Sequence, residues 1–219
     1  MARLYTGLEP ERVRRNADDV RRRMAEAAQR AGRSPGDVEL LAAVKYVPLE
    51  ELGVLRAAGI ELVGENRAQD LVAKAQNFPE YRWHFIGQLQ SRKVKLIAPH
   101  AQLIHSVDSE SALEQLGRHA LPQTEILIQV NVAREADKAG VDPDEVGDFV
   151  RASPVPVVGL ATMPPFTDDA QASRPHFAAL RELAQTHGLQ HLSMGTSQDF
   201  EVAVEEGATI VRVGSTLYT

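Results

Sequence analysis

The chain has 219 residues, a formal net charge of −6 and no cysteine. The absence of cysteine excludes disulfides, thiolate metal sites and cysteine nucleophiles. An apolar fraction of 43% and a charged fraction of 25% are typical of one globular domain, and the net negative charge gives no general attraction to nucleic acid. No apolar run approaches the about 18 residues of a membrane span, and no signal-peptide pattern is present, so we expect a cytoplasmic protein.

The first predicted element is an arginine-rich helix. Apolar residues recur at helical spacing between Val13 and Ala31, and Gly32 and Pro35 end the pattern. Acidic residues are interleaved with the arginines, which is typical of a solvated helix face and disfavours a surface that binds nucleic acid. We therefore expect an N-terminal helical extension over residues 1–36.

From Val38 onward, strand-like and helix-like segments alternate. The predicted strands are Val38–Lys45, Glu61–Glu65, Arg82–Ile86, Leu103–Val107, Glu125–Asn131, Val157–Met163, His191–Met194 and Thr209–Val213. The predicted helices are Leu49–Ala58, Arg67–Asn77, Leu89–Ala98, Glu110–His119, Pro143–Ala152, Ala170–Thr186 and Ser197–Glu206. Eight such units favour an α/β fold, a single-domain (β/α)8 TIM barrel over residues 37–219, with an open doubly wound sheet as the alternative.

Lys45 stands at the carboxyl end of the first predicted strand. That strand is apolar on both faces, as expected in a parallel sheet covered by helices, and such sheets carry their chemistry at the carboxyl ends of the strands. Burial there would lower the pKa of the Lys45 amine and supply the neutral nucleophile that Schiff-base formation needs. The alternative is that Lys45 has left the core and points to water.

Polar residues occur at nearly every predicted strand end. They include Lys45, Glu65, Asn66, His84, His105, Asn131, Ser193, Ser197, Arg212 and Ser215. The strand ends of a barrel converge on one face, so these side chains predict a single site there.

Two turns in the last two units are suited to phosphate. Gly195-Thr196-Ser197 precedes the last predicted helix, and Gly214-Ser215 follows the last strand. Backbone N–H groups and the Ser197 hydroxyl could hold a phosphate, and phosphate sites after strands seven and eight recur in this fold. The alternative role of Ser197 is to cap the helix that follows.

Arg212 lies inside the last predicted strand, either as a charge at the strand edge or as a buried donor. A buried arginine needs a partner, because an uncompensated interior charge is costly. A phosphorylated heteroaromatic ligand whose ring nitrogen accepts from Arg212 would supply one. The cation would keep that nitrogen unprotonated and weaken it as an electron sink.

Several motifs along nearly the whole chain resemble those of one family. They are Leu40-Leu41-Ala42-Ala43-Val44-Lys45, Gly64-Glu65-Asn66, His84-Phe85-Ile86-Gly87-Gln88-Leu89-Gln90, Gln129-Val130-Asn131, Lys138-Ala139-Gly140, Ser193-Met194-Gly195-Thr196-Ser197-Gln198-Asp199 and Val211-Arg212-Val213-Gly214-Ser215. The chain resembles the pyridoxal-phosphate homeostasis family, which is similar in fold to the barrel domain of alanine racemase.

The resemblance implies pyridoxal 5′-phosphate (PLP) as cofactor, held as an internal aldimine on Lys45. It implies that Arg212 faces the pyridine nitrogen. It also implies that the phosphate is bound by Ser197, Gly214 and Ser215. The wall of the cofactor pocket would include Asn66 and His84. Val44, Ser215 and Ala161 depart mildly from the family pattern, and no metal is implied.

The sequence also bears on whether the protein is an enzyme. Similar racemases use a second base, a tyrosine from another domain and the partner subunit, and this chain has no room for that domain. None of its four tyrosines marks a catalytic base, and strand alternation predicts that Tyr46 faces away from Lys45.

We therefore expect a monomer that is not an enzyme, that holds PLP for intracellular homeostasis, and that passes it to PLP-dependent apoenzymes. The alternatives are a weak PLP-dependent amino-acid racemase and a class-I aldolase-like barrel, in which Lys45 would react with a phosphorylated sugar.

Overall fold

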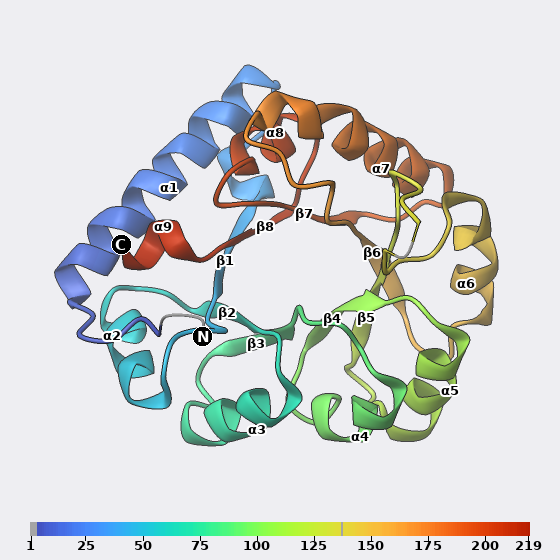
Figure 1. Cartoon of the computed structure of the whole chain (residues 1–219), viewed down its shortest axis with the longest axis horizontal. Coiled ribbons are helices and arrows are strands. Elements are labelled where there is room, and N and C mark those ends of the chain that lie inside the picture. The colour runs from blue at the N-terminus through green and yellow to red at the C-terminus, as the bar shows by residue number, and fades with distance from the viewer. Residues whose placement is uncertain (1–3, 137) are drawn as a thin grey trace.

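The computed structural model describes residues 4–136 and 138–219, and within them eight parallel strands close into a barrel (Figure 1). Each strand pairs with the next along the chain, and β8 pairs with β1. The strands are β1 (Glu39–Ala43), β2 (Leu62–Glu65), β3 (Arg82–Phe85), β4 (Leu103–Val107), β5 (Glu125–Gln129), β6 (Val157–Ala161), β7 (His191–Thr196) and β8 (Ile210–Val213). The closed order confirms the predicted (β/α)8 barrel and excludes the open sheet.

The strand ends differ in places from the prediction. β1 ends at Ala43, so Lys45 lies in the turn beyond it, and β5 ends at Gln129. β7 runs on to Thr196, two residues past the predicted end at Met194. Its pairing with β8 shifts register between Ser193 and Thr196, an irregularity that the period-two pattern of the sequence does not signal.

Helices alternate with the strands around the barrel. They are α1 (Pro10–Arg30), α2 (Leu52–Ala57), α3 (Ala68–Asn77), α4 (Val94–Ile97), α5 (Glu110–His119), α6 (Val146–Ala152), α7 (Arg174–Thr186), α8 (Phe200–Glu205) and α9 (Ser215–Tyr218). Short 3₁₀ turns at Leu49–Glu51, Pro143–Glu145 and Ala170–Ser173 explain why three helices were predicted to begin a few residues before α2, α6 and α7. α9 follows β8 directly and has no counterpart among the predicted helices.

Helix α1 is part of the outer helical layer. It lies beside α8 and α9 on the outside of the barrel (Figure 1). Arg23 pairs with Glu201 at 2.5 Å and Arg30 with Glu205 at 2.7 Å, which ties α1 to α8. These arginines therefore bind the protein's own acids, which agrees with the mixed-charge helix face expected from the sequence.

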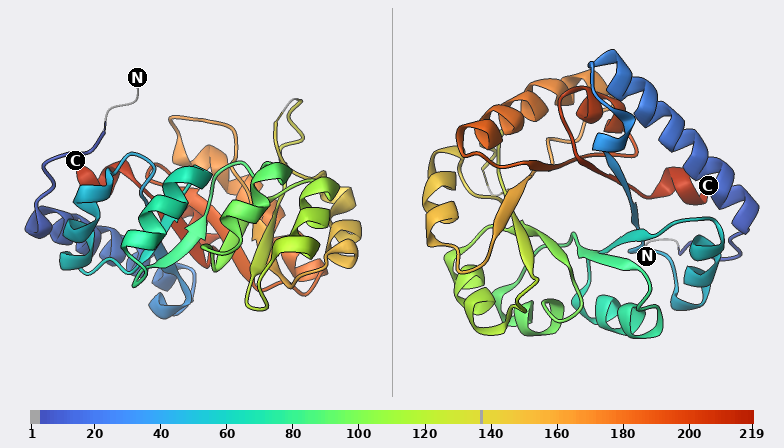
Figure 2. Two further views of the ribbon diagram at one scale, coloured as in Figure 1. Left: turned by 90° about the horizontal axis from the view of Figure 1, so that it is seen from below. Right: turned by 180° about the vertical axis from the view of Figure 1, so that it is seen from behind.

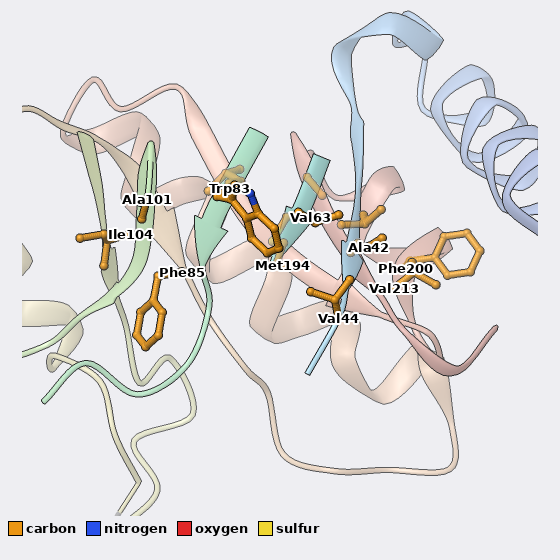
Figure 3. Packing of buried hydrophobic residues seen from close by; sticks show 14 of the residues in the cluster. Ala42, Val44, Val63, Trp83, Phe85, Ala101, Ile104, Met194, Phe200 and Val213 are labelled. Carbon is orange, nitrogen blue, oxygen red and sulfur yellow. The ribbon is translucent and has the colours of Figure 1, made fainter. Parts of the chain in front are cut away.

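The two faces of the barrel wall bury different side chains. Ala42, Val44, Trp83 and Phe85 belong to the large buried cluster, and Figure 3 shows part of its packing. The inward side chains form a smaller apolar layer, namely Leu41, Leu62, Leu103, Leu127, Ala161 and Ile210. Within the described part of the chain, no helix is both long enough and apolar enough to span a lipid bilayer.

Candidate functional site

An open cavity of about 330 Å³ lies at the carboxyl ends of β1, β7 and β8. Seen from the side, the loop after β6 projects from one edge of the barrel (Figure 2). The lining residues are Tyr5, Ala43, Lys45, Tyr46, Thr196, Ser197, Gln198, Arg212, Gly214 and Ser215. The structure thus brings together five of the seven predicted PLP-binding residues, namely Lys45, Ser197, Arg212, Gly214 and Ser215. Among the described residues, this lining holds two cations and no carboxylate, which suits an anionic ligand.

Lys45 lies at the mouth of this cavity. Its side chain is exposed, so the desolvated amine expected from the sequence is not what the structure shows. Its Nζ lies 5.0 Å from the centre of the Tyr46 ring, and the prediction that Tyr46 faces away was wrong. β1 ends at Ala43, so strand alternation does not extend to these two residues. Tyr5 reaches the same cavity through a hydrogen bond from its N–H to the Tyr46 carbonyl at 2.9 Å.

A buried ion pair supports the turn that carries Lys45. The Nζ of Lys74 on α3 lies 2.5 Å from a carboxylate oxygen of Glu65 and donates to the carbonyl of Val44 at 2.8 Å. The other Glu65 oxygen accepts from the N–H groups of Asn66 and Arg67. Lys74 is not among the residues predicted from the sequence. Its position on the buried face of α3, with Leu71 and Ala75, is the signal that could have found it.

The two predicted phosphate turns lie against each other. The N–H of Gly214 donates to Ser197 Oγ at 3.2 Å. Asp199 closes the first turn by accepting from the N–H of Thr196 at 2.7 Å, and α8 begins at Phe200. Because Asp199 rather than Ser197 occupies the N-cap position, the Ser197 hydroxyl does not cap the helix and is directed to the second turn.

Gly195 allows the first turn to pack closely on α8. Its φ is +89°, and a Cβ at this position would lie 2.5 Å from the Cβ of Ala203. Only glycine can adopt this positive φ and this close approach to α8 without strain, which explains why glycine begins the turn.

Arg212 is buried in the floor of the cavity. Its guanidinium donates to the carbonyls of Ser193 at 2.7 Å and Thr162 at 2.8 Å, and to the Ser193 hydroxyl. Burial lowers the pKa of Arg212 to about 10, against the opposing effect of the Asp199 carboxylate, so the side chain stays cationic at neutral pH. The structure therefore confirms a buried donor, and within the described residues its hydrogen-bond partners are neutral.

Two of the seven predicted PLP-binding residues, His84 and Asn66, do not line the cavity, and neither do the strand-end residues Glu65, His105, Asn131 and Ser193. His84 points into the barrel interior, where its Nδ1 lies 3.0 Å from Nε2 of His105. Asn66 follows β2, and its buried Oδ1 has no hydrogen-bond partner among residues 4–136 and 138–219. A buried acceptor without a partner is uncommon in a folded protein and marks a place where a ligand or water can donate.

The buried histidines predict acid-sensitive stability. Burial lowers the pKa of His84 to about 3 and that of His105 well below the ordinary value of 6.5. Below pH 6.5 the unfolded chain therefore binds protons that the folded chain does not. The free energy of unfolding should fall by up to about 1.4 kcal/mol per pH unit for each histidine. Urea denaturation at pH 7.0 and pH 5.5 measures this slope. A His84→Gln variant with an equally steep slope would contradict the assignment.

Comparisons with known proteins agree with this geometry. Residues 15–219 match the family described as alanine racemase, N-terminal domain. The chain is 40% identical to the pyridoxal phosphate homeostasis protein of Aquifex aeolicus (strain VF5), over 91% of this chain and 94% of that protein. It is 39% identical to the protein of the same name from Pseudomonas aeruginosa, over 94% of each.

A solved structure of PipY from Synechococcus elongatus PCC7942 with PLP bound has a TM-score of 0.74 and is 33% identical, over 90% of this chain and 100% of that one. These similarities confirm the resemblance that the motifs indicated. The chain belongs to the family of pyridoxal phosphate homeostasis proteins, which shares the alanine racemase N-terminal domain fold.

Proposed function

We propose that this protein binds pyridoxal 5′-phosphate for PLP homeostasis and is not an enzyme. The observation that carries the proposal is the cavity lining, in which an amine, a guanidinium, two serine hydroxyls and a glycine-serine turn surround a space of about 330 Å³. This donor set matches a phosphate ester at one end and an aldehyde and a ring acceptor at the other. PipY, with one third of its residues identical, is a protein whose structure contains PLP.

Each group in the cavity has a proposed part in holding PLP. The Nζ of Lys45 condenses with the aldehyde, releasing water, and the resulting covalent bond retains the ligand. Ser197, Gly214 and Ser215 receive the phosphate, at the turns after β7 and β8 where this fold binds phosphate. Arg212 donates to the pyridine nitrogen and keeps it unprotonated.

Asn66 and His84 do not line the cavity, and each is assigned to PLP binding on a different observation. Asn66 has a buried Oδ1 that can accept a hydrogen bond. His84 is connected to Arg212 through His105 and Ser193 rather than through the cavity.

Borohydride reduction followed by peptide mass spectrometry tests the proposal directly. Purified protein is mixed with PLP, reduced, digested and mapped. We expect one pyridoxyl group per chain, on the peptide that contains Lys45. An adduct spread over the exposed lysines of the outer helices, such as Lys95, would count against a specific site.

A weak racemase is the second candidate, because the structure places Tyr5 and Tyr46 in the same cavity as Lys45. A tyrosine near the lysine is a possible second acid or base. Loss of optical rotation from D- and L-alanine separates the candidates. We expect turnover far below about 1 per second, the lower end of ordinary enzyme rates. Turnover at or above that rate would establish the enzyme.

The phosphate turn and Arg212 should contribute differently to binding. Ser197→Ala removes one hydrogen bond to a charged group and should weaken PLP retention about tenfold, with little change in the absorption maximum. Arg212→Ala should shift the absorption maximum, because the pyridine nitrogen can then bind a proton. Absorption spectra and equilibrium dialysis measure the two effects, and equal spectral shifts in both variants would contradict this division.

We also infer that the protein acts as a cytoplasmic monomer that passes PLP to apoenzymes. Light scattering of the holo-protein tests the oligomeric state. Incubation with a PLP-dependent apoenzyme tests transfer, which should restore that enzyme's activity faster than release of PLP into buffer allows.

A further inference from the structure

Four buried polar side chains form a row across the barrel interior. The row begins at His84 on β3 and His105 on β4. It crosses the barrel to Ser193 on β7 and Arg212 on β8, two neighbouring strands that do not pair with β3 or β4. His84 Nδ1 lies 3.0 Å from His105 Nε2, and His105 Nδ1 lies 2.8 Å from Ser193 Oγ. Arg212 Nη1 donates to the same Ser193 oxygen at 2.5 Å. The row therefore connects the wall at β3 with the floor of the cavity.

The donors in this row follow from the chemistry of its members. A guanidinium only donates, so Ser193 Oγ accepts from Arg212. A buried hydroxyl proton needs an acceptor, and His105 Nδ1, 2.8 Å from Ser193 Oγ, can accept it when that ring nitrogen carries no proton. His105 then carries its proton on Nε2 and donates to His84 Nδ1, and His84 carries its own proton on Nε2. Both rings are neutral in this arrangement, which agrees with the effect of burial on their pKa values.

This arrangement determines how Arg212 is held. Its other oxygen partners among the described residues are the main-chain carbonyls of Ser193 and Thr162, which accept hydrogen bonds over a broad range of directions. The Ser193 hydroxyl would rotate if its proton had no acceptor. His105 takes that proton and so turns a lone pair of Ser193 toward Arg212, and hydrogen bonds aligned in one direction strengthen one another.

We propose that His105, supported by His84, is a positioning residue that fixes the Arg212 guanidinium through the Ser193 hydroxyl and thereby sets the hydrogen bond offered to the pyridine nitrogen of PLP. The proposal rests on the proposed PLP binding. It gives a role to two histidines that do not line the cavity.

The first test uses the protein without PLP. Long-range ¹H–¹⁵N NMR spectra of histidine-labelled protein distinguish the two neutral tautomers of each ring. We expect His84 and His105 to be protonated on Nε2 at pH 7, and Ser193→Ala to move the Nδ1 resonance of His105. A His105 ring protonated on Nδ1 would overturn the assignment of donors.

The second test uses the PLP-loaded protein. His105→Leu and Ser193→Ala should each shift the absorption maximum in the same direction as Arg212→Ala and raise the apparent dissociation constant about threefold to tenfold. His105→Asn, whose Oδ1 can accept from Ser193, should restore both values. The double variant His105→Leu/Ser193→Ala should bind PLP no more weakly than the weaker-binding single variant, because the two residues act in one row.

Ser106→Ala is the matched control, since Ser106 is a buried serine on β4 that donates to the Gly87 carbonyl and lies outside the row. It should leave the spectrum unchanged. If His105 served stability alone, His105→Leu would have a lower melting temperature and an unchanged absorption spectrum. That result would overturn the proposal.

The two tests separate this inference from the proposed function. A wild-type protein that takes up no PLP defeats the proposed function, while the tautomers of the unliganded protein still confirm or overturn the row. If the wild-type protein binds PLP but its absorption spectrum equals those of Ser193→Ala and His105→Leu, the positioning role is wrong and the proposed function stands. Should His105→Leu fail to fold, Ser193→Ala and the tautomers decide the question.

Discussion

Replacing Lys45 by alanine should abolish the covalent retention of PLP. The variant loses the one amine that lines the cavity among residues 4–136 and 138–219, while the phosphate turns and Arg212 stay in place. We expect no pyridoxyl adduct after borohydride reduction and loss of the ligand on dialysis, with an unchanged melting temperature because the side chain is exposed. Peptide mass spectrometry and absorption spectra measure the outcome.

Two further variants separate the amine from its charge. Lys45→Arg keeps a cation at the same place but cannot condense with an aldehyde, so it should also yield no adduct. Lys95→Ala removes an exposed lysine on α4 and should keep the full adduct. A covalent adduct that persists at wild-type yield in both Lys45 variants would show that another residue carries PLP.

Replacing Glu65 by glutamine should destabilise the protein by roughly 3–5 kcal/mol, because it leaves the buried ammonium of Lys74 without its counter-charge. The same change loosens the turn at Val44, to which Lys74 donates, and should weaken PLP binding as well. Urea denaturation of the unliganded protein measures the stability, and equilibrium dialysis measures the binding.

A double variant and a surface pair provide the controls. Glu65→Gln combined with Lys74→Met removes both charges and should be less destabilised than the sum of the single variants. Asp148→Asn breaks an ion pair with Arg151 that is mostly exposed, and should change stability by no more than about 0.5 kcal/mol. Additive losses in the double variant would show that Glu65 and Lys74 do not act as a buried pair.

The site was predictable where chemistry follows local pattern. Lys45, Ser197, Gly214 and Ser215 each lie at or within a few residues of the carboxyl end of a strand that periodicity identifies, and a closed barrel collects such positions on one face. Arg212 was recognisable as a charge within an apolar strand. What the pattern did not show was that Tyr5 reaches the cavity, because the N-terminal segment is placed there by a hydrogen bond to Tyr46.

The sequence by itself determined the order and number of strands, the barrel class, and half of the residues that line the cavity, since these depend on periodicity and on residue type. The tertiary structure alone decided where β1 ends, that α1 completes the outer layer, that Lys74 supports the turn at Lys45, and that His105 meets Ser193. Those contacts join residues far apart in the chain, 88 positions apart for His105 and Ser193. They depend on pairing register and side-chain packing, which no local pattern encodes.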